Sequence, residues 1–369
     1  MATFGSKHPA RHNPLDDEEE EISEPLLTIP HAELAARFQR LLVGQPGVAP
    51  KILPYVQMYQ AGLNPPGRPA GVFLLLGPTG TGKTRTVEAL AEALHGKSST
   101  MLRIDCGEFQ LDHEVAKLIG APPGYLGHRE TQPLLSQSRL NAQTSDACDL
   151  TILLFDEIEK AAPSMMRLLL GMLDRGQMRM GDNNTVSFEK SVVFMTSNLG
   201  ADAMQKAIRP RLGFASLAST HEPHEVGKSA KRRLESIGVH AARRKFSPEF
   251  MNRIDAILTY APLDEGAIEQ ILQMQIDALQ NHIRTRLGDS AFEIRVTQRL
   301  RKHLLEHGIS QEYGARELKR TIQRYVLQPL STVVVDGRAV PGSTVVMDWK
   351  GNEKVLIRVQ SPPPQPLAA

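Results

Sequence analysis

The amino-acid sequence predicts an α/β protein in which a parallel β-sheet core covered by helices is followed by a smaller, mostly helical domain. The first observation is that short apolar runs alternate with stretches whose apolar residues recur at helical spacing. This alternation is typical of buried parallel strands joined by crossover helices. The second observation is a change of character near residue 262, after which amphipathic helices predominate and two strand-like runs close the domain.

The elements follow from apolar spacing, taken in chain order. A helix is expected where Leu34, Phe38, Leu41 and Leu42 recur at helical spacing, with Gly44 ending it. The strands expected in the first domain are residues 71–76, 101–105, 151–156 and 191–196, with a helix over 87–94. In the second domain we expect helices over residues 268–283, 299–307 and 315–327, and strands over 343–349 and 354–359.

These expectations divide the chain into a tail over residues 1–28, a large α/β domain over 29–262, a smaller lid domain over 263–360 and a proline-rich tail over 361–369. Residues 16–21 are all Asp or Glu, which indicates either a solvated leader or an arm that docks on a basic partner.

Composition restricts the class of protein. The 369 residues are 41% hydrophobic and 23% charged with a formal net charge of +2, which is typical of a globular chain and gives no global field for nucleic acid. The apolar runs are too short to span a bilayer, and the N-terminus lacks an apolar signal segment. Only Cys106 and Cys148 occur, so a disulfide scaffold is excluded. We therefore expect a cytoplasmic protein without a membrane segment.

The strongest motif is a glycine-rich loop between an expected strand and an expected helix. It matches G-x-x-x-x-G-K-[ST] and consists of Gly77, Pro78, Thr79, Gly80, Thr81, Gly82, Lys83 and Thr84. Such a loop wraps a phosphate with backbone N–H groups at a helix N-terminus. Its lysine reaches the β- and γ-phosphates and its threonine hydroxyl binds Mg²⁺. The sequence therefore predicts a nucleoside triphosphate site.

Two further apolar strands end in polar residues that suit hydrolysis at that site. Asp156 and Glu157 follow one strand, where Asp156 is expected to hold Mg²⁺ and Glu157 to polarise the attacking water. Asn198 follows another strand and could orient the same water, although Ser-Asn at a strand end is also ordinary turn chemistry.

The motifs stand in an order that resembles the second ATPase module of the Clp-type AAA+ unfoldases and disaggregases. The segments that carry the likeness are VGQ at 43–45, the loop at 77–84, IDCGEF at 104–109, GAPPGYLG at 120–127, LLFDEIEKAAP at 153–163, FMTSNLGA at 194–201, FSPEFMNRID at 246–255 and YGARELKR at 313–320. The resemblance implies a P-loop AAA+ fold with a lid domain, and an enzyme that hydrolyses ATP with Mg²⁺.

The resemblance also implies roles for individual residues. Val43 and Gly44 would line the adenine pocket, and Asn198 would be the first sensor. Arg316 would read the γ-phosphate within its own subunit, and Arg253 would be the arginine finger that reaches a neighbour's nucleotide. A rigid, always-charged guanidinium suits the spread charge of a transferring phosphoryl group.

A loop with Tyr125 and Leu126 between glycines resembles the loop that grips polypeptide in the central pore of the family's rings. An aromatic side chain can grip extended chains by apolar contact without reading their sequence. The resemblance therefore implies a homo-oligomeric, hexameric ring that unfolds protein. With one phosphate loop and no cysteine cluster, the sequence resembles a stand-alone single-ring form.

Three alternatives stay open. Leu212, Gly213 and Phe214 resemble a tripeptide that docks on a Clp-type peptidase, or else they fold back on the core; residues 215–228 after them are expected to form an exposed loop. A nucleic-acid-directed AAA+ ATPase is the second alternative, against which the Tyr125 loop and the small net charge argue. The third is a scaffold that does not hydrolyse ATP, which the intact catalytic motifs disfavour.

Overall fold

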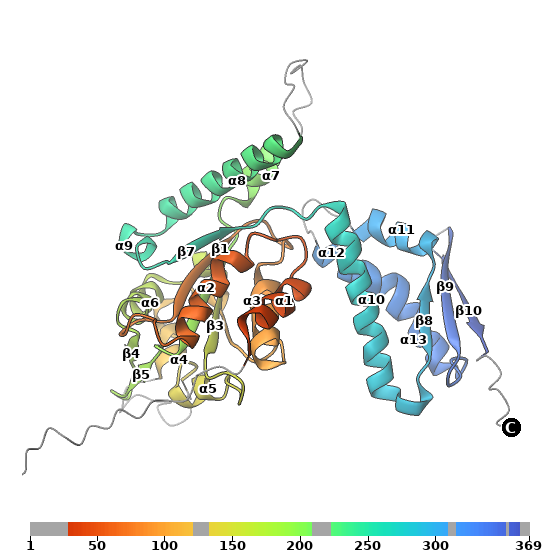
Figure 1. Cartoon of the computed structure of the whole chain (residues 1–369), viewed down its shortest axis with the longest axis horizontal. Helices are drawn as coiled ribbons and strands as arrows, with labels where there is room; N and C mark the ends of the chain where they lie inside the picture. The colour runs from red at the N-terminus through yellow and green to blue at the C-terminus, as the bar shows by residue number, and fades with distance from the viewer. Residues whose placement is uncertain (1–28, 121–132, 209–222, 309–314, 352–353, 362–369) are drawn as a thin grey trace, which may run out of the picture.

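The computed structural model describes residues 29–120, 133–208, 223–308, 315–351 and 354–361 (Figure 1). A five-stranded sheet forms the centre of the N-terminal part, in the order β2-β3-β6-β1-β7. All four pairs of neighbouring strands are parallel, so their carboxyl ends meet at one edge. The strands are β1 (Gly71–Leu76), β2 (Leu102–Asp105), β3 (Thr151–Asp156), β6 (Ser191–Ser197) and β7 (Ala256–Thr259).

Alternate residues of the central strands enter two different cores, because successive side chains of a strand point to opposite faces. Phe73, Leu154 and Phe194 pack with the helices on one face, whereas Leu74, Phe155 and Met195 pack on the other. This explains why β1, β3 and β6 are apolar throughout.

The helices of this part are α1 (His31–Leu41), α2 (Ala49–Gln60), α3 (Lys83–His95), α4 (Ala116–Ile119), α5 (Gln137–Asn141), α6 (Pro163–Arg175), α7 (Ala201–Ile208), α8 (Pro223–Lys245) and α9 (Pro248–Met251), and a small hairpin joins β4 (Gln177–Arg179) to β5 (Thr185–Ser187).

The C-terminal part has a core of its own, drawn from residues after 262. A three-stranded sheet in the order β10-β9-β8 packs against the helices, and the long helix α10 leads into it from β7 (Figure 1). Its elements are α10 (Glu265–Leu287), β8 (Glu293–Val296), α11 (Gln298–Gly308), α12 (Ala315–Ile322), a π-helical turn (Gln323–Leu327), α13 (Gln328–Val335), β9 (Thr344–Gly351) and β10 (Lys354–Gln360).

The predicted fold class is confirmed, and every strand predicted from an apolar run is present within one or two residues. Four shorter strands, β4, β5, β7 and β8, have no counterpart in the prediction, nor have helices α2, α4 to α9 and α13. Pro54 lies inside helix α2, and because proline usually interrupts a helix, no helix is predicted there from the sequence. The exposed loop expected over 215–228 is wrong from Pro223 onward, because Pro223 heads the long helix α8, a position that suits its fixed φ.

Both cysteines are buried and free, so the two thiols form no disulfide with each other. Within the described residues, no helix combines the length and apolar character needed to cross a membrane.

Candidate functional site

A cavity of about 770 Å³ lies where the N-terminal part meets the C-terminal part. One wall is the glycine-rich loop, from Thr79 to Thr84, at the carboxyl edge of the sheet. The opposite wall comes from α10 and α12 and carries Arg316 and Lys319. Apolar side chains also line the cavity, from the end of α1 and the residues after it and from α10 and the segment before it: Leu41, Leu42, Val43, Leu263, Ile271 and Met274. A volume of this size suits a nucleotide, with an apolar end for a base and a cationic end for phosphates.

The loop reaches its shape through glycines. Gly82 has φ +99° and stands directly before α3, and no side chain caps that helix. The N-terminal N–H groups of α3 therefore lack a side-chain acceptor, which is the arrangement that binds anions. A Cβ at Gly77 would lie 2.8 Å from the backbone oxygen of Tyr260, so the loop can pass this point only as glycine.

Lys83 lies buried inside the loop. Its Nζ donates to the carbonyl oxygens of Gly77 at 2.6 Å and Pro78 at 2.9 Å, and to Asn198 Oδ1 at 2.9 Å. Burial lowers the pKa of Lys83 to about 8, against the opposing pull of nearby carboxylates such as Glu159 and Asp156. Within the described residues the hydrogen-bond acceptors of Lys83 Nζ are neutral oxygens, so an anionic phosphate would add the attraction of an opposite charge to this desolvated cation.

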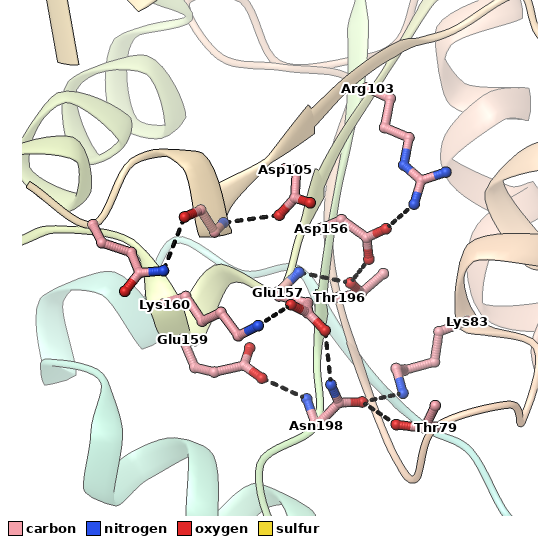
Figure 2. Close-up of polar contacts among 12 residues, drawn as sticks. Thr79, Lys83, Arg103, Asp105, Asp156, Glu157, Glu159, Lys160, Thr196 and Asn198 are labelled. Atoms are coloured by element: carbon pink, nitrogen blue, oxygen red, sulfur yellow. Dashed lines mark hydrogen bonds and ion pairs between the residues drawn. The ribbon is translucent and has the colours of Figure 1, made fainter. Parts of the chain in front are cut away.

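The two predicted acids differ in their surroundings. Asp156 is buried, with one carboxylate oxygen accepting from the Thr196 hydroxyl and the other from Arg103 Nη2 at 2.5 Å (Figure 2). Glu157 has a left-handed backbone with φ +55°, which is uncommon for a residue with a Cβ and costs about 1 kcal/mol or more. Strain of this kind is typical of functional sites, and here it directs the Glu157 side chain to Asn198 and Lys160.

Asn198 connects the lysine to the glutamate (Figure 2). Its Oδ1 accepts from Lys83, and its Nδ2 donates to Glu157 Oε1 at 3.4 Å. The backbone N–H of Asn198 donates to Glu159 Oε1 at 3.0 Å, which fixes the end of β6. The amide group therefore touches both the group expected to bind phosphate and the group expected to activate water.

Hydrogen bonds join the glycine-rich loop and the start of α3 to residues 260–261, which precede α10, and to α12 of the C-terminal part. Gln45 Nε2 donates to the carbonyl oxygens of Thr81 at 3.1 Å and Ala261 at 2.9 Å. The backbone N–H of Ala315, at the start of α12, donates to the carbonyl oxygen of Gly80 at 3.2 Å. The hydroxyl groups of Thr86 and the fully buried Tyr260 are 2.6 Å apart. A movement of the loop would therefore change the hydrogen bond between Gly80 and Ala315 and so reach the C-terminal part.

The structure gathers most of the predicted site residues at this cavity. Lys83, Thr84, Asp156, Glu157, Asn198, Val43 and Arg316 all line it. Gly44 has φ +78° and lies behind the wall, where a Cβ would come within 3 Å of Leu263 and Ala267. Arg253 does not line the cavity and pairs with Asp174, with 2.8 Å between Nε and Oδ1. Tyr125 and Leu126, like Leu212, Gly213 and Phe214, lie outside the described residues.

Sequence reasoning missed several residues of the site. Arg103 carried no motif of its own, and only its place one strand away from the Asp-Glu pair could have singled it out. Gln45 was noticed only as part of a family segment. The apolar wall from α10, with Ile271 and Met274, looked like ordinary core spacing in the sequence.

The residues present fit a nucleotide with Mg²⁺. The loop supplies N–H groups and a cation for phosphates, and Thr84 and Asp156 supply the hard oxygen ligands that Mg²⁺ prefers. Among the described residues, no three His, Cys, Asp or Glu side chains are grouped as a metal site. The protein oxygens at this cavity would thus be a partial ligand set, which suits Mg²⁺ shared with substrate phosphates.

Comparison with known proteins identifies two matching families. Residues 68–257 match the model of an AAA domain of the Cdc48 subfamily, and residues 263–347 match the C-terminal D2-small domain of ClpB protein.

Relatives in Staphylococcus carry the name ATP-dependent Clp protease ATP-binding subunit ClpC. The protein of S. epidermidis is 36% identical over 85% of this chain, and that of S. aureus strain USA300 is 34% identical over 92%. The chain spans 36% and 38% of the length of these relatives.

Solved structures of Hsp104 have the same fold. A complex of S. cerevisiae Hsp104 with casein has a TM-score of 0.73 and 28% sequence identity, over 91% of this chain and 54% of the Hsp104 chain. A closed state of Hsp104 with ATPγS and casein has a TM-score of 0.70, over 89% of this chain and 51% of the other.

Proposed function

Because the chain belongs to the Clp-type AAA+ family, matching it over the second ATPase module, we propose that it is an ATP-hydrolysing motor that remodels proteins by threading them through a ring pore. The observation that carries the proposal is the connected set Lys83, Asn198 and Glu157, which faces a cavity closed on its other side by Arg316. A protein that bound ATP without hydrolysing it would need the glycine-rich loop, but it would not need Glu157 held in a strained backbone conformation.

In this proposal each residue has a separate task. ATP binds with its base on the apolar wall near Val43, and Lys83 exchanges its carbonyl partners for the β- and γ-phosphates. Thr84 and Asp156 hold Mg²⁺, which neutralises phosphate charge when bound. Glu157 accepts the proton of the attacking water and Asn198 orients that water. Arg316 reads the γ-phosphate and passes the signal to the C-terminal part.

The working form in this proposal is a hexameric ring in the cytoplasm. Arg253 does not line its own cavity, and this supports a role at a neighbour's nucleotide. Tyr125 and Leu126 would grip the polypeptide in the pore. We also propose that the large and small domains divide near residue 262, where the third core begins. Hsp104, which shares the fold, has been solved with casein, and this supports a polypeptide as substrate.

The test is ATPase activity with and without cargo, using unfolded casein and single-stranded DNA. We expect stimulation by casein and none by DNA, and a Glu157→Gln variant should bind ATP, fail to hydrolyse it and retain casein. Stimulation by DNA alone would favour the nucleic-acid-directed alternative instead. Absence of any phosphate release by the parent would contradict an ATPase.

A second candidate function is favoured by the name that the relatives carry, ATP-binding subunit of a Clp protease. In this variant the ring delivers its cargo to a Clp-type peptidase through Leu212, Gly213 and Phe214. The test is binding to the Clp peptidase of the same organism, in which Leu212→Ser and Phe214→Ser should each lose most of the affinity while keeping ATPase activity. If the parent shows no binding, the motor releases its cargo.

A further inference from the structure

The guanidinium of Arg103 lies against Asp156, the proposed metal ligand. Arg103 belongs to β2, which pairs with β3, and its Nη2 donates to Asp156 Oδ2 at 2.5 Å (Figure 2). Thr196 donates to the other oxygen of the same carboxylate. Both oxygens of Asp156 are thus occupied by hydrogen bonds from the protein itself.

The two partners are exposed to different degrees. The Asp156 side chain is 13% exposed, whereas that of Arg103 is 49% exposed, and both residues line the cavity. Leaving the largely buried carboxylate of Asp156 without a cation would cost free energy. Arginine supplies a positive charge that does not titrate. Because much of the Arg103 side chain lies in the open cavity wall, it can leave Asp156 without breaking a packed core.

A divalent cation needs the same carboxylate oxygen. Hard cations bind carboxylate oxygen directly, and a guanidinium hydrogen-bonded to that oxygen repels an incoming positive ion. Arg103 and the divalent cation therefore compete for Asp156. The free energy needed to break the Arg103–Asp156 pair reduces the net free energy of metal binding.

We propose that Arg103 is a positioning residue that holds the charge of Asp156 in the empty site and is displaced when Mg²⁺ enters with the nucleotide. The proposal rests on the proposed function, since it assumes a nucleotide in this cavity. Arg103 sets how strongly nucleotide affinity depends on Mg²⁺: with arginine the metal must displace a cation, and without it the carboxylate is free to bind. The competing explanation is an ion pair that only holds β2 against β3.

The experiment measures the dissociation constant of ADP calorimetrically, in excess Mg²⁺ and in EDTA, for the full chain. The informative quantity is the ratio of the EDTA value to the Mg²⁺ value. We compare the parent with Arg103→Gln, which removes the charge, and Arg103→Lys, which keeps it without the planar fork. Arg85→Gln is the matched control, because Arg85 also lines the cavity but pairs with Glu92 at 3.3 Å.

We expect the ratio to rise at least about threefold in Arg103→Gln, the scale of a partly buried charged pair, and less in Arg103→Lys. Arg85→Gln should keep the parental ratio even if its overall affinity changes. An unchanged ratio in Arg103→Gln, or an equal rise in Arg85→Gln, would overturn the proposal. If Arg103→Gln does not fold by circular dichroism, a parental ratio in Arg103→Lys overturns it. Absence of ADP binding by the parent would contradict the proposed function instead.

Discussion

Gln45 offers a direct test of how the glycine-rich loop is tied to the chain just before the C-terminal part. A Gln45→Met substitution keeps the length of the side chain and removes both N–H donors. Gln45 is 7% exposed and Thr81 is 3% exposed, so the Thr81 carbonyl is left without this donor in a dry place. An unpaired buried carbonyl costs about 1–3 kcal/mol. The Ala261 carbonyl is only part-buried, so water can replace its lost donor and we add less than about 1 kcal/mol.

We therefore expect Gln45→Met to lower the free energy of unfolding of the N-terminal part by about 1–4 kcal/mol, which lowers its melting temperature by roughly 2–16 °C for a domain of this size. Circular dichroism follows the whole chain. Trp349, the one tryptophan, stacks on His303 with 3.5 Å between ring centroids and reports the C-terminal part, which should shift less. Gln57→Met on the exposed face of α2 is the control, with a change within about 0.5 kcal/mol. Equal melting temperatures for the Gln45 and Gln57 variants would refute the reasoning.

The remaining predictions concern the nucleotide, the neighbouring subunit and the cargo. Lys83→Ala should abolish ATP binding, because the lysine is the cation inside the loop; an unchanged affinity in calorimetry would remove its assignment. Arg253→Ala should leave ATP binding intact and cost about 10³-fold or more in turnover, and mixing it with Glu157→Gln subunits should restore some phosphate release. A mixture that forms rings yet stays inactive would contradict the role in trans. Tyr125→Ala should keep ATPase activity and lose the unfolding of a fluorescent substrate; unfolding at the parental rate would show that another residue grips the cargo.

The central strands and the glycine-rich loop could be predicted because their causes are local. A run such as Val72–Leu76 is apolar throughout because it is buried on both faces, and the loop after it carries its glycines where the backbone requires them. Asp156 and Glu157 follow the same logic, since parallel strands present their carboxyl ends at one edge. Strand β7 escaped prediction because its apolar run, Ala256 to Leu258, is only three residues long.

The fold class, the phosphate loop and the acids beside it could be inferred from the residues alone, since each follows from spacing or from the needs of a few neighbouring residues. Which distant groups meet depends on how the folded chain packs. Gln45 reaches a carbonyl 216 residues away, and Arg103 reaches a carboxylate 53 residues away. No local pattern encodes such contacts, because they depend on the order of strands in the sheet and on where α10 leaves it. The Arg103–Asp156 ion pair and the Gln45 hydrogen bonds that join the loop to Ala261 are products of that packing.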